Sequence, residues 1–90
     1  MEKHKKVEKL QRALGEIIRG RRQNVDISQE ELAERCGLHR NYISEIERGL
    51  KSASLKTIAL IAFSLECPPH VLIQEAEELL KNDDSDRLSQ

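Results

Sequence analysis

Apolar residues near the N-terminus recur at intervals of three and four, which is the spacing of one face of an α-helix. The pattern runs from Val7 to Ile18, and helix-forming residues continue to about Gln23. Residues 25–27 interrupt it and are expected to form a connection. The chain is therefore predicted to open with one long helix and a short link.

Start and stop signals divide the middle of the chain into two short helices. Ser28, with Glu31 three residues later, is a capping-box pattern that starts a second helix. Gly37 offers a permissive backbone for a tight stop. After a short turn, a third helix is predicted over residues 40–48, ended by Gly49.

Two further helices are predicted in the second half. Ser54 can cap a fourth helix over residues 55–65. Its expected buried face comprises Leu55, Ile58, Ala59, Ala62 and Phe63. The prolines at positions 68 and 69 break this helix and suit the start of a fifth, which is expected to reach about Lys81. The remaining residues, 82–90, are acidic and are predicted to form a flexible tail.

The composition favours one all-α domain. Ninety residues can build one compact core, and only Tyr42 and Phe63 are aromatic, which argues against a β-sandwich. We predict a five-helix domain over residues 1–81. The net charge is −1, but residues 1–51 carry a balance of +3 and residues 52–90 a balance of −4. The front half is therefore suited to meet a polyanion.

Several classes of site and location are not favoured. Cys36 and Cys67 lie in apolar-periodic segments, which predicts buried, reduced thiols rather than a disulfide. The charged N-terminus does not resemble a signal peptide, and no run approaches the roughly 18 apolar residues of a membrane span, so we expect a cytoplasmic protein without a membrane partner. Cys67 and His70 are the only pair near metal-ligand spacing, so neither a metal nor another cofactor is predicted.

Catalytic patterns are not found either. The glycines form no phosphate-binding loop, and no nucleophile lies in a recognisable relation to a base. The acidic residues of the fifth helix, Glu75, Glu77 and Glu78, are interpreted as a solvated face. The chain is therefore predicted not to be an enzyme.

The second and third helices have the spacing of a helix-turn-helix unit, whose second helix enters the DNA major groove. In the third helix, Ile43, Ile46 and Leu50 are expected to point inward, and the opposite face carries Arg40, Asn41, Ser44, Glu45 and Arg48. Arginine can donate two hydrogen bonds to guanine, asparagine can pair with adenine, and serine allows close approach. The spacing is equally compatible with an ordinary solvated helix face.

The segment SQEELAERCGLHRNYISEIERG, residues 28–49, closely resembles the helix-turn-helix of the Cro and lambda-repressor-like family, also called the Xre family. The segments before and after it resemble the family's first and fourth helices, so the similarity covers about residues 10–75. Residues 40–49 look most like the small controller proteins of restriction-modification systems, which are dimers. The resemblance implies a lambda-repressor-like fold and a transcriptional regulator that binds a pseudo-palindromic double-stranded DNA operator as a homodimer.

The resemblance also assigns roles to individual residues. Base reading is implied for Arg40, Asn41, Tyr42, Ser44 and Glu45. Contacts to the DNA backbone are implied for Gln29, His39, Arg48, Lys51, Ser52 and Lys56. Tyr42 could equally cover the edge of the core, and each basic residue could be a solubilising charge. The family pairs the counterpart of Glu47 with an arginine of the first helix, here Arg22.

Two residues depart from the family pattern. Asp26 replaces a common glycine, although aspartate tolerates a left-handed backbone better than most residues. His39 occupies a position where a better capping residue is common, which weakens the start of the third helix.

A dimer needs a self-complementary apolar surface, because one short recognition helix reads only a few base pairs. The fourth and fifth helices carry more apolar residues than a single buried stripe requires. The predicted interface comprises Ile61, Phe63, Val71, Leu72, Ile73, Ala76 and Leu79. The alternative is that all of these residues close the core of one chain.

Two other functions remain open at this point. An antitoxin of the same fold would bind DNA while its acidic C-terminal part holds a toxin. A helical protein-interaction module would keep the fold without binding DNA, although the Arg40, Asn41 and Ser44 face then has little purpose. The operator sequence, the sign of regulation, any effector and any contact with RNA polymerase are not specified by the sequence.

Overall fold

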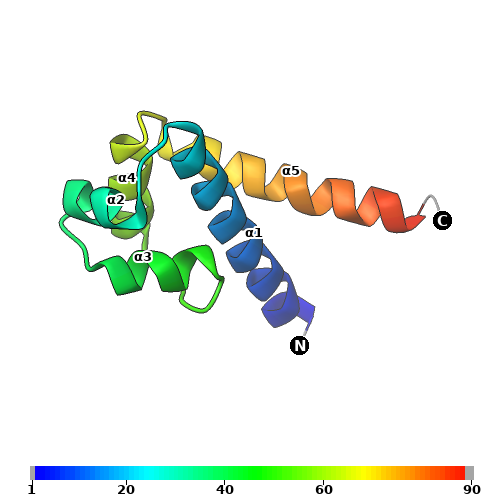
Figure 1. Cartoon of the computed structure of the whole chain (residues 1–90). Coiled ribbons are helices and arrows are strands. Elements are labelled where there is room, and N and C mark those ends of the chain that lie inside the picture. Colours follow the sequence, from blue (N-terminus) through cyan, green and yellow to red (C-terminus); the bar gives the residue numbers. More distant parts are fainter. Residues whose placement is uncertain (1, 89–90) are drawn as a thin grey trace.

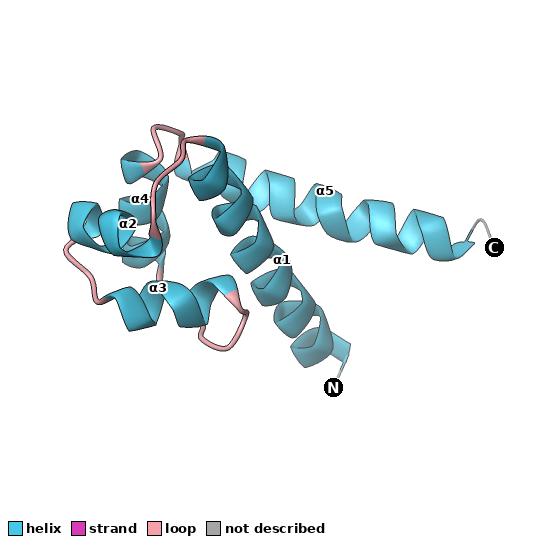
Figure 2. Ribbon diagram, in the orientation of Figure 1, coloured by secondary structure: helices cyan, strands magenta, loops and turns pink. Residues whose placement is uncertain are grey.

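Five α-helices joined by short loops make up residues 2–88, the part of the chain that the computed structural model describes (Figures 1 and 2). Side chains are described as far as Asn82. The helices are α1 (Glu2–Asn24), α2 (Gln29–Cys36), α3 (Arg40–Glu47), α4 (Leu55–Ser64) and α5 (Pro69–Leu88). The predicted all-α, five-helix architecture is confirmed.

Two helices are longer than the apolar pattern predicted. α1 begins at Glu2 rather than at Val7, because lysine and glutamate favour a helix even where no apolar face is buried. α5 continues past Lys81 to Leu88, and neither glycine nor proline interrupts it there. The flexibility of residues 82–90 stays a prediction, and residues 89 and 90 lie outside the described part of the chain.

The first four helices end in the same backbone turn. The residue after each helix adopts a left-handed conformation, with φ between 58° and 74°, at Asp26, Gly37, Gly49 and Glu66. The next N–H then bonds back into the last turn, as from Leu38 to the Ala33 carbonyl oxygen at 2.9 Å, which is the Schellman pattern. The predicted stops at both glycines and the left-handed Asp26 are confirmed, whereas the left-handed Glu66 was not predicted.

Side chains cap two of the helix starts. Ser28 Oγ accepts a hydrogen bond from the Glu31 N–H at 3.0 Å, and Ser54 caps α4 in the same way. The Glu31 carboxylate instead pairs with Arg35 at 3.0 Å. His39 makes no side-chain cap at the start of α3, which agrees with the weak cap predicted there.

The core forms where all five helices meet. One fully buried aliphatic residue comes from each helix in turn: Ile18, Leu32, Ile43, Ile61 and Leu72. The two cysteines are buried and unpaired, as predicted. Burial also raises the pKa of the Cys67 thiol.

The predicted buried face of α4 is largely wrong. Leu55 is 80% exposed and Phe63 is 66% exposed, whereas Thr57, Ile61 and Ala62 are buried. Apolar residues surround this short helix on most sides, so periodicity alone does not select the face that packs. Leu50 is likewise exposed rather than inward, because α3 ends at Glu47 and the turn after it leads the chain away from the core.

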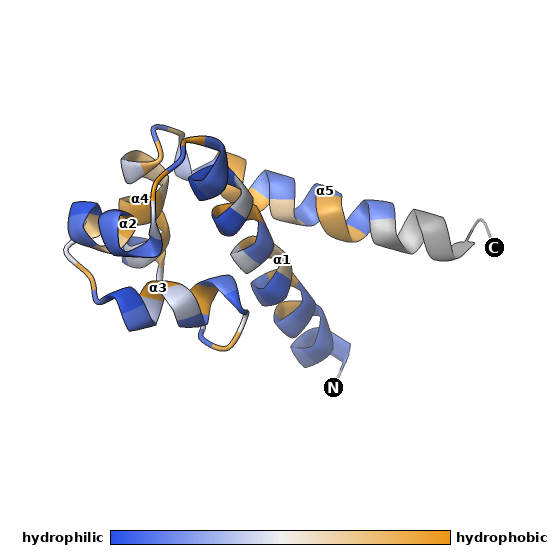
Figure 3. Cartoon of the chain, in the orientation of Figure 1, coloured by the Kyte–Doolittle hydropathy of each residue, from blue (hydrophilic) through white to orange (hydrophobic). Residues whose placement is uncertain are grey.

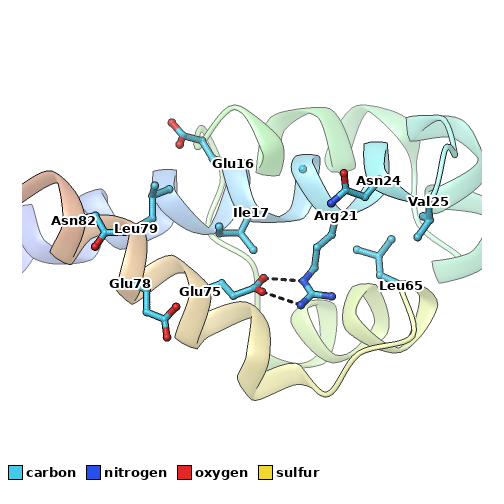
Figure 4. Close-up of a pocket in the computed structure, with 11 residues that line it drawn as sticks. Glu16, Ile17, Arg21, Asn24, Val25, Leu65, Glu75, Glu78, Leu79 and Asn82 are labelled. Atoms are coloured by element: carbon cyan, nitrogen blue, oxygen red, sulfur yellow. Dashed lines mark hydrogen bonds and ion pairs between the residues drawn. The ribbon is translucent and has the colours of Figure 1, made fainter.

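α1 and α5 are joined by an ion pair that was not predicted. The Arg21 guanidinium donates two hydrogen bonds to the Glu75 carboxylate, at 2.7 and 2.9 Å, beside a cleft of about 540 Å³ (Figure 4). These bonds raise the pKa of Arg21 and lower the pKa of Glu75. The assignment of Glu75 to a purely solvated face is therefore wrong.

No single helix among residues 2–88 is both long and apolar enough to cross a membrane. Residues 55–64 and 69–82 pass the same test as a pair, by length and composition alone, with a bend of 99° between them. Within the same range, no group of three or more His, Cys, Asp or Glu side chains is arranged to hold a metal ion.

α1 crosses the end of α3 at Gly15, where the backbones are too close for a side chain. A Cβ atom added to Gly15 would meet the Ile46 carbonyl oxygen and would lie 2.7 Å from that of Glu47. Gly20, on the same helix, has nothing within 4 Å of such an atom. The crossing distance between the two helices therefore depends on the glycine at position 15 alone.

We expect Gly15→Ala to lower the free energy of unfolding by about 1–3 kcal/mol, since the crossing would be overpacked. Gly20→Ala is the matched control and should raise it by about 0.5–1 kcal/mol through helix propensity. Denaturant unfolding of both variants checks the prediction. Equal effects at the two positions would contradict the close crossing.

Candidate nucleic-acid interface

α2 and α3 form the helix-turn-helix arrangement predicted from the sequence. Each has eight residues, and residues 37–39 join them through the turn at Gly37. Leu32 of α2 and Ile43 of α3 are fully buried in the shared core. α3 lies at the edge of the molecule, so its opposite side faces outward (Figure 1).

The outward side of α3 brings the predicted base-reading residues together. Arg40, Asn41 and Arg48 are exposed, and Ser44 and Glu45 are partly exposed. Ile43 and Ile46 are buried on the other side, as predicted. α3 therefore presents a polar face with arginine at both ends.

Tyr42 lies between the two interpretations given above. Its side chain is half-buried and packs against the core. The structure therefore supports a role at the edge of the core, while a contact with DNA stays a prediction.

Arg40 has one partner within the described chain. Its Nε lies 3.6 Å from a carboxylate oxygen of Glu30 on α2, and both side chains are largely exposed. An exposed ion pair of this kind contributes little, at most about 1 kcal/mol. Arg40 can therefore exchange Glu30 for another acceptor at small cost.

The other end of α3 is fixed by a buried ion pair. The Arg22 Nε and Nη2 atoms donate to the two oxygens of the Glu47 carboxylate at 2.7 and 3.0 Å. The Glu47 side chain is 1% exposed and that of Arg22 is 11% exposed. These bonds raise the pKa of Arg22. The predicted structural pair is therefore present.

Two further hydrogen bonds extend this pair into a network. Arg22 Nη1 donates to the Ile27 carbonyl oxygen at 2.9 Å, and Gln29 Nε2 donates to the Glu47 carboxylate at 3.0 Å. The network thus joins the end of α1, the following link, the start of α2 and the end of α3. Gln29 is positioned by Glu47, and its predicted contact with phosphate stays a prediction.

The remaining predicted backbone contacts lie around the two ends of α3. His39 is exposed at the start of the helix. Arg48, Lys51, Ser52 and Lys56 are all exposed between the end of α3 and the first turn of α4. The structure therefore gathers one histidine and three permanent positive charges beside the polar face of α3.

Gly49 has a role that the sequence analysis did not predict. A Cβ atom added there would lie 2.6 Å from Arg12 Cγ, and Gln11 Nε2 donates to the Gly49 carbonyl oxygen at 2.9 Å. α1 thus contacts the turn that ends α3. The available signal was Gly15, because a glycine inside a helix often marks a close backbone approach.

Three residues of the predicted dimer interface are wrong. Ile61, Leu72 and Ala76 have no exposed surface, because they already fill the core of a single chain. Phe63, Val71, Ile73 and Leu79 keep exposed or partly exposed surface. For the first three, the alternative of closing the monomer core is the correct one.

We expect Glu47→Ala to lower the free energy of unfolding by about 3–5 kcal/mol, because it leaves the largely buried Arg22 guanidinium without its partner. Glu31→Ala, which removes an exposed pair with Arg35, is the control and should cost no more than about 1 kcal/mol. Thermal and denaturant unfolding measure both. An unchanged midpoint for Glu47→Ala would show that the pair does not support the fold.

Comparisons with known proteins agree with this geometry. The Helix-turn-helix family model matches residues 18–72, which include all of α2, α3 and α4. Control protein C.SmaI of Serratia marcescens is 38% identical over 71 residues, covering 78% of this chain and 81% of that protein. Control protein C.BamHI of Bacillus amyloliquefaciens is 48% identical over 48 residues, covering 53% of this chain. An uncharacterised HTH-type transcriptional regulator of Mycobacterium tuberculosis is 37% identical over 62 residues, covering 69% of this chain.

The match spans only part of two of these relatives, 59% of C.BamHI and 44% of the Mycobacterium tuberculosis regulator. Solved structures give the same fold. The restriction-modification controller protein C.AhdI of Aeromonas hydrophila has a TM-score of 0.67 at 36% identity, covering 68% of this chain and 92% of that one. The clp gene regulator ClgR of Corynebacterium glutamicum has a TM-score of 0.78 at 29% identity, covering 89% and 87%.

The relatives are transcriptional regulators, which are not enzymes, so the prediction that this chain is not an enzyme is confirmed. The resemblance to the Xre family and to controller proteins is also confirmed. On the strength of the family match and these relatives, the chain belongs to the helix-turn-helix family of transcriptional regulators.

Proposed function

We propose that the chain binds a specific double-stranded DNA operator as a homodimer and regulates transcription in the cytoplasm, in the manner of a restriction-modification controller. The observation that carries this proposal is the exposed polar face of α3, whose C-terminal end is fixed by the Arg22–Glu47 pair. A face intended for base reading must be held in one orientation relative to the scaffold. The similarity to proteins named as control proteins supports the same role.

The chemistry of the α3 face fits base edges in the major groove. Arg40 can donate two hydrogen bonds to guanine, and Asn41 can pair with adenine. Ser44, one helical turn beyond Arg40, is short enough to allow close approach, and Glu45 can accept from the amino group of cytosine. These four residues are proposed to read sequence.

The residues around this face are proposed to contact phosphates. Arg48, Lys51 and Lys56 supply positive charge at the end of α3 and the start of α4. Gln29, His39 and Ser52 supply polar donors. Contacts of this kind set register and affinity but do not discriminate between bases.

The proposed dimer surface is centred on exposed apolar residues of α4 rather than on the buried ones. Phe63 and Leu55 are largely exposed, and α4 is the most apolar helix (Figure 3). A large apolar side chain left in water favours association, because burying it gains about 1.5–3 kcal/mol. Val71, Ile73 and Leu79 on α5 are proposed as further members. A two-fold dimer would place its half-sites about 34 Å apart.

The DNA-binding proposal is tested by selecting bound sequences from random duplexes and then titrating variants. We expect Arg40→Ala to lower affinity for the selected duplex by about 1–3 kcal/mol while binding to a random duplex falls much less. Arg35→Ala, an exposed arginine of α2, is the matched control. Equal weakening on both duplexes would make Arg40 a phosphate contact, and failure to enrich any sequence would overturn the proposed function.

We expect Phe63→Lys to give folded monomers with greatly reduced operator affinity, because a charge would replace the apolar centre of the interface. Val25→Lys alters another exposed apolar residue, in the link after α1, and is the control. Sedimentation and circular dichroism measure assembly and folding separately. A wild-type chain that stays monomeric at tens of micromolar and binds a single half-site at full strength would contradict the dimer.

A further inference from the structure

The first three turns of α1 extend beyond the helix-turn-helix motif and are strongly basic. Residues 2–12 contain five lysine or arginine residues and two glutamates, a balance of +3. Residues 2–9 are exposed, and the matched family region begins only at residue 18. Neither the packing of the core nor the α3 face accounts for this charge.

Part of this charge lies on one line along the helix. Lys5, Arg12 and Arg19 are spaced by seven residues, which places them within about 40° of one another around the axis. All three are exposed, and none of them forms an ion pair within residues 2–88. We call these three residues the α1 stripe.

The α1 stripe lies on the side of α1 next to α3. Measured around the helix from the buried Ile18, the α3-facing residues Gly15 and Arg22 lie at about 40–60°, and the α1 stripe follows at about 100–140°. The stripe is therefore one step further from the core than α3. It faces solvent on the same outer side as the polar face of α3.

The stripe is also connected to the end of α3. Arg12 packs directly on Gly49, and Gln11 donates a hydrogen bond to the Gly49 carbonyl oxygen. Val7 and Leu10 line a hollow of about 150 Å³ together with Ser52 and Ala53, in the loop that follows Lys51. The basic residues of α1 are thus continuous with Arg48 and Lys51.

We propose that the α1 stripe is a second phosphate-binding surface, which contacts the DNA backbone flanking the base pairs read by α3. This inference rests on the proposed DNA binding and names residues outside the helix-turn-helix motif. In Figure 1 the N-terminal turns of α1 run past the loop after α3, and residues 2–12 add about 15 Å of helix. The surface supplies affinity without base specificity, because it meets only phosphates.

The test compares two double variants that remove the same charge from the same helix. Lys5→Gln with Arg12→Gln alters the α1 stripe and retains the Cγ atom of residue 12 that contacts Gly49. Lys3→Gln with Lys6→Gln is the control, because these residues lie about 100° or more away around the helix. Glutamine is a good helix former, so the fold should persist in both, as circular dichroism can verify.

Binding is measured against salt concentration on a selected operator and on a random duplex. The stripe variant should lose affinity for both by the same factor, and the slope of log affinity against log salt should fall by about 1.8, from about 0.9 for each phosphate contact. The control should change the slope by much less. Trimming the operator to the base pairs read by α3 should weaken the wild type and leave the stripe variant unaffected.

Equal changes in the two double variants would show that only the overall charge matters, and would overturn the proposed surface. Unchanged binding by the stripe variant, beside a wild type that binds the operator, would also overturn it while leaving the proposed function intact. A wild type that binds no duplex at all would instead refute the proposed function.

Discussion

The orientation of α3 depends on one buried carboxylate, that of Glu47. A charge at a fully buried position costs several kcal/mol unless charged and polar donors surround it. Here Arg22 and Gln29 supply three hydrogen bonds, and they come from the end of α1 and the start of α2. The end of α3 can therefore occupy this position only when both other helices are in place. An apolar contact would accept many small shifts, whereas this arrangement of donors accepts few.

The two ends of α3 are constrained to different degrees. At the C-terminal end, the Glu47 network is reinforced by the close backbone contact at Gly15. At the N-terminal end, His39 supplies no side-chain cap, and Arg40 has only an exposed partner in Glu30. The residues proposed to read bases thus belong to the less constrained half of the helix. Such an arrangement fixes where the helix lies while leaving the side chains at its tip free to adjust.

Local signals in the sequence predicted most of the fold, and the remainder depended on contacts between distant residues. Ser28 and Gly37 act within a few residues of their own position, so each could be identified without a structure. The packing face of α4 could not, because nearly every side of that helix is apolar and its neighbours decide which side is buried. The Arg21–Glu75 pair joins residues 54 positions apart, and no periodicity relates them. Within the site, the Arg22–Glu47 pair followed from family resemblance rather than from spacing.

The uneven charge along the chain becomes a spatial separation through the way α1 is shared between its neighbours. On one side, α1 meets the acidic α5, and Arg21 is neutralised there by Glu75 (Figure 4). On the other side it meets α3, where Arg22 is neutralised by Glu47. Both arginines that face a neighbouring helix are thus paired, and the positive charge left on α1 lies on its exposed surface. The positive surface proposed to face DNA and the negative surface of α5 are therefore held apart by the same helix that organises the core.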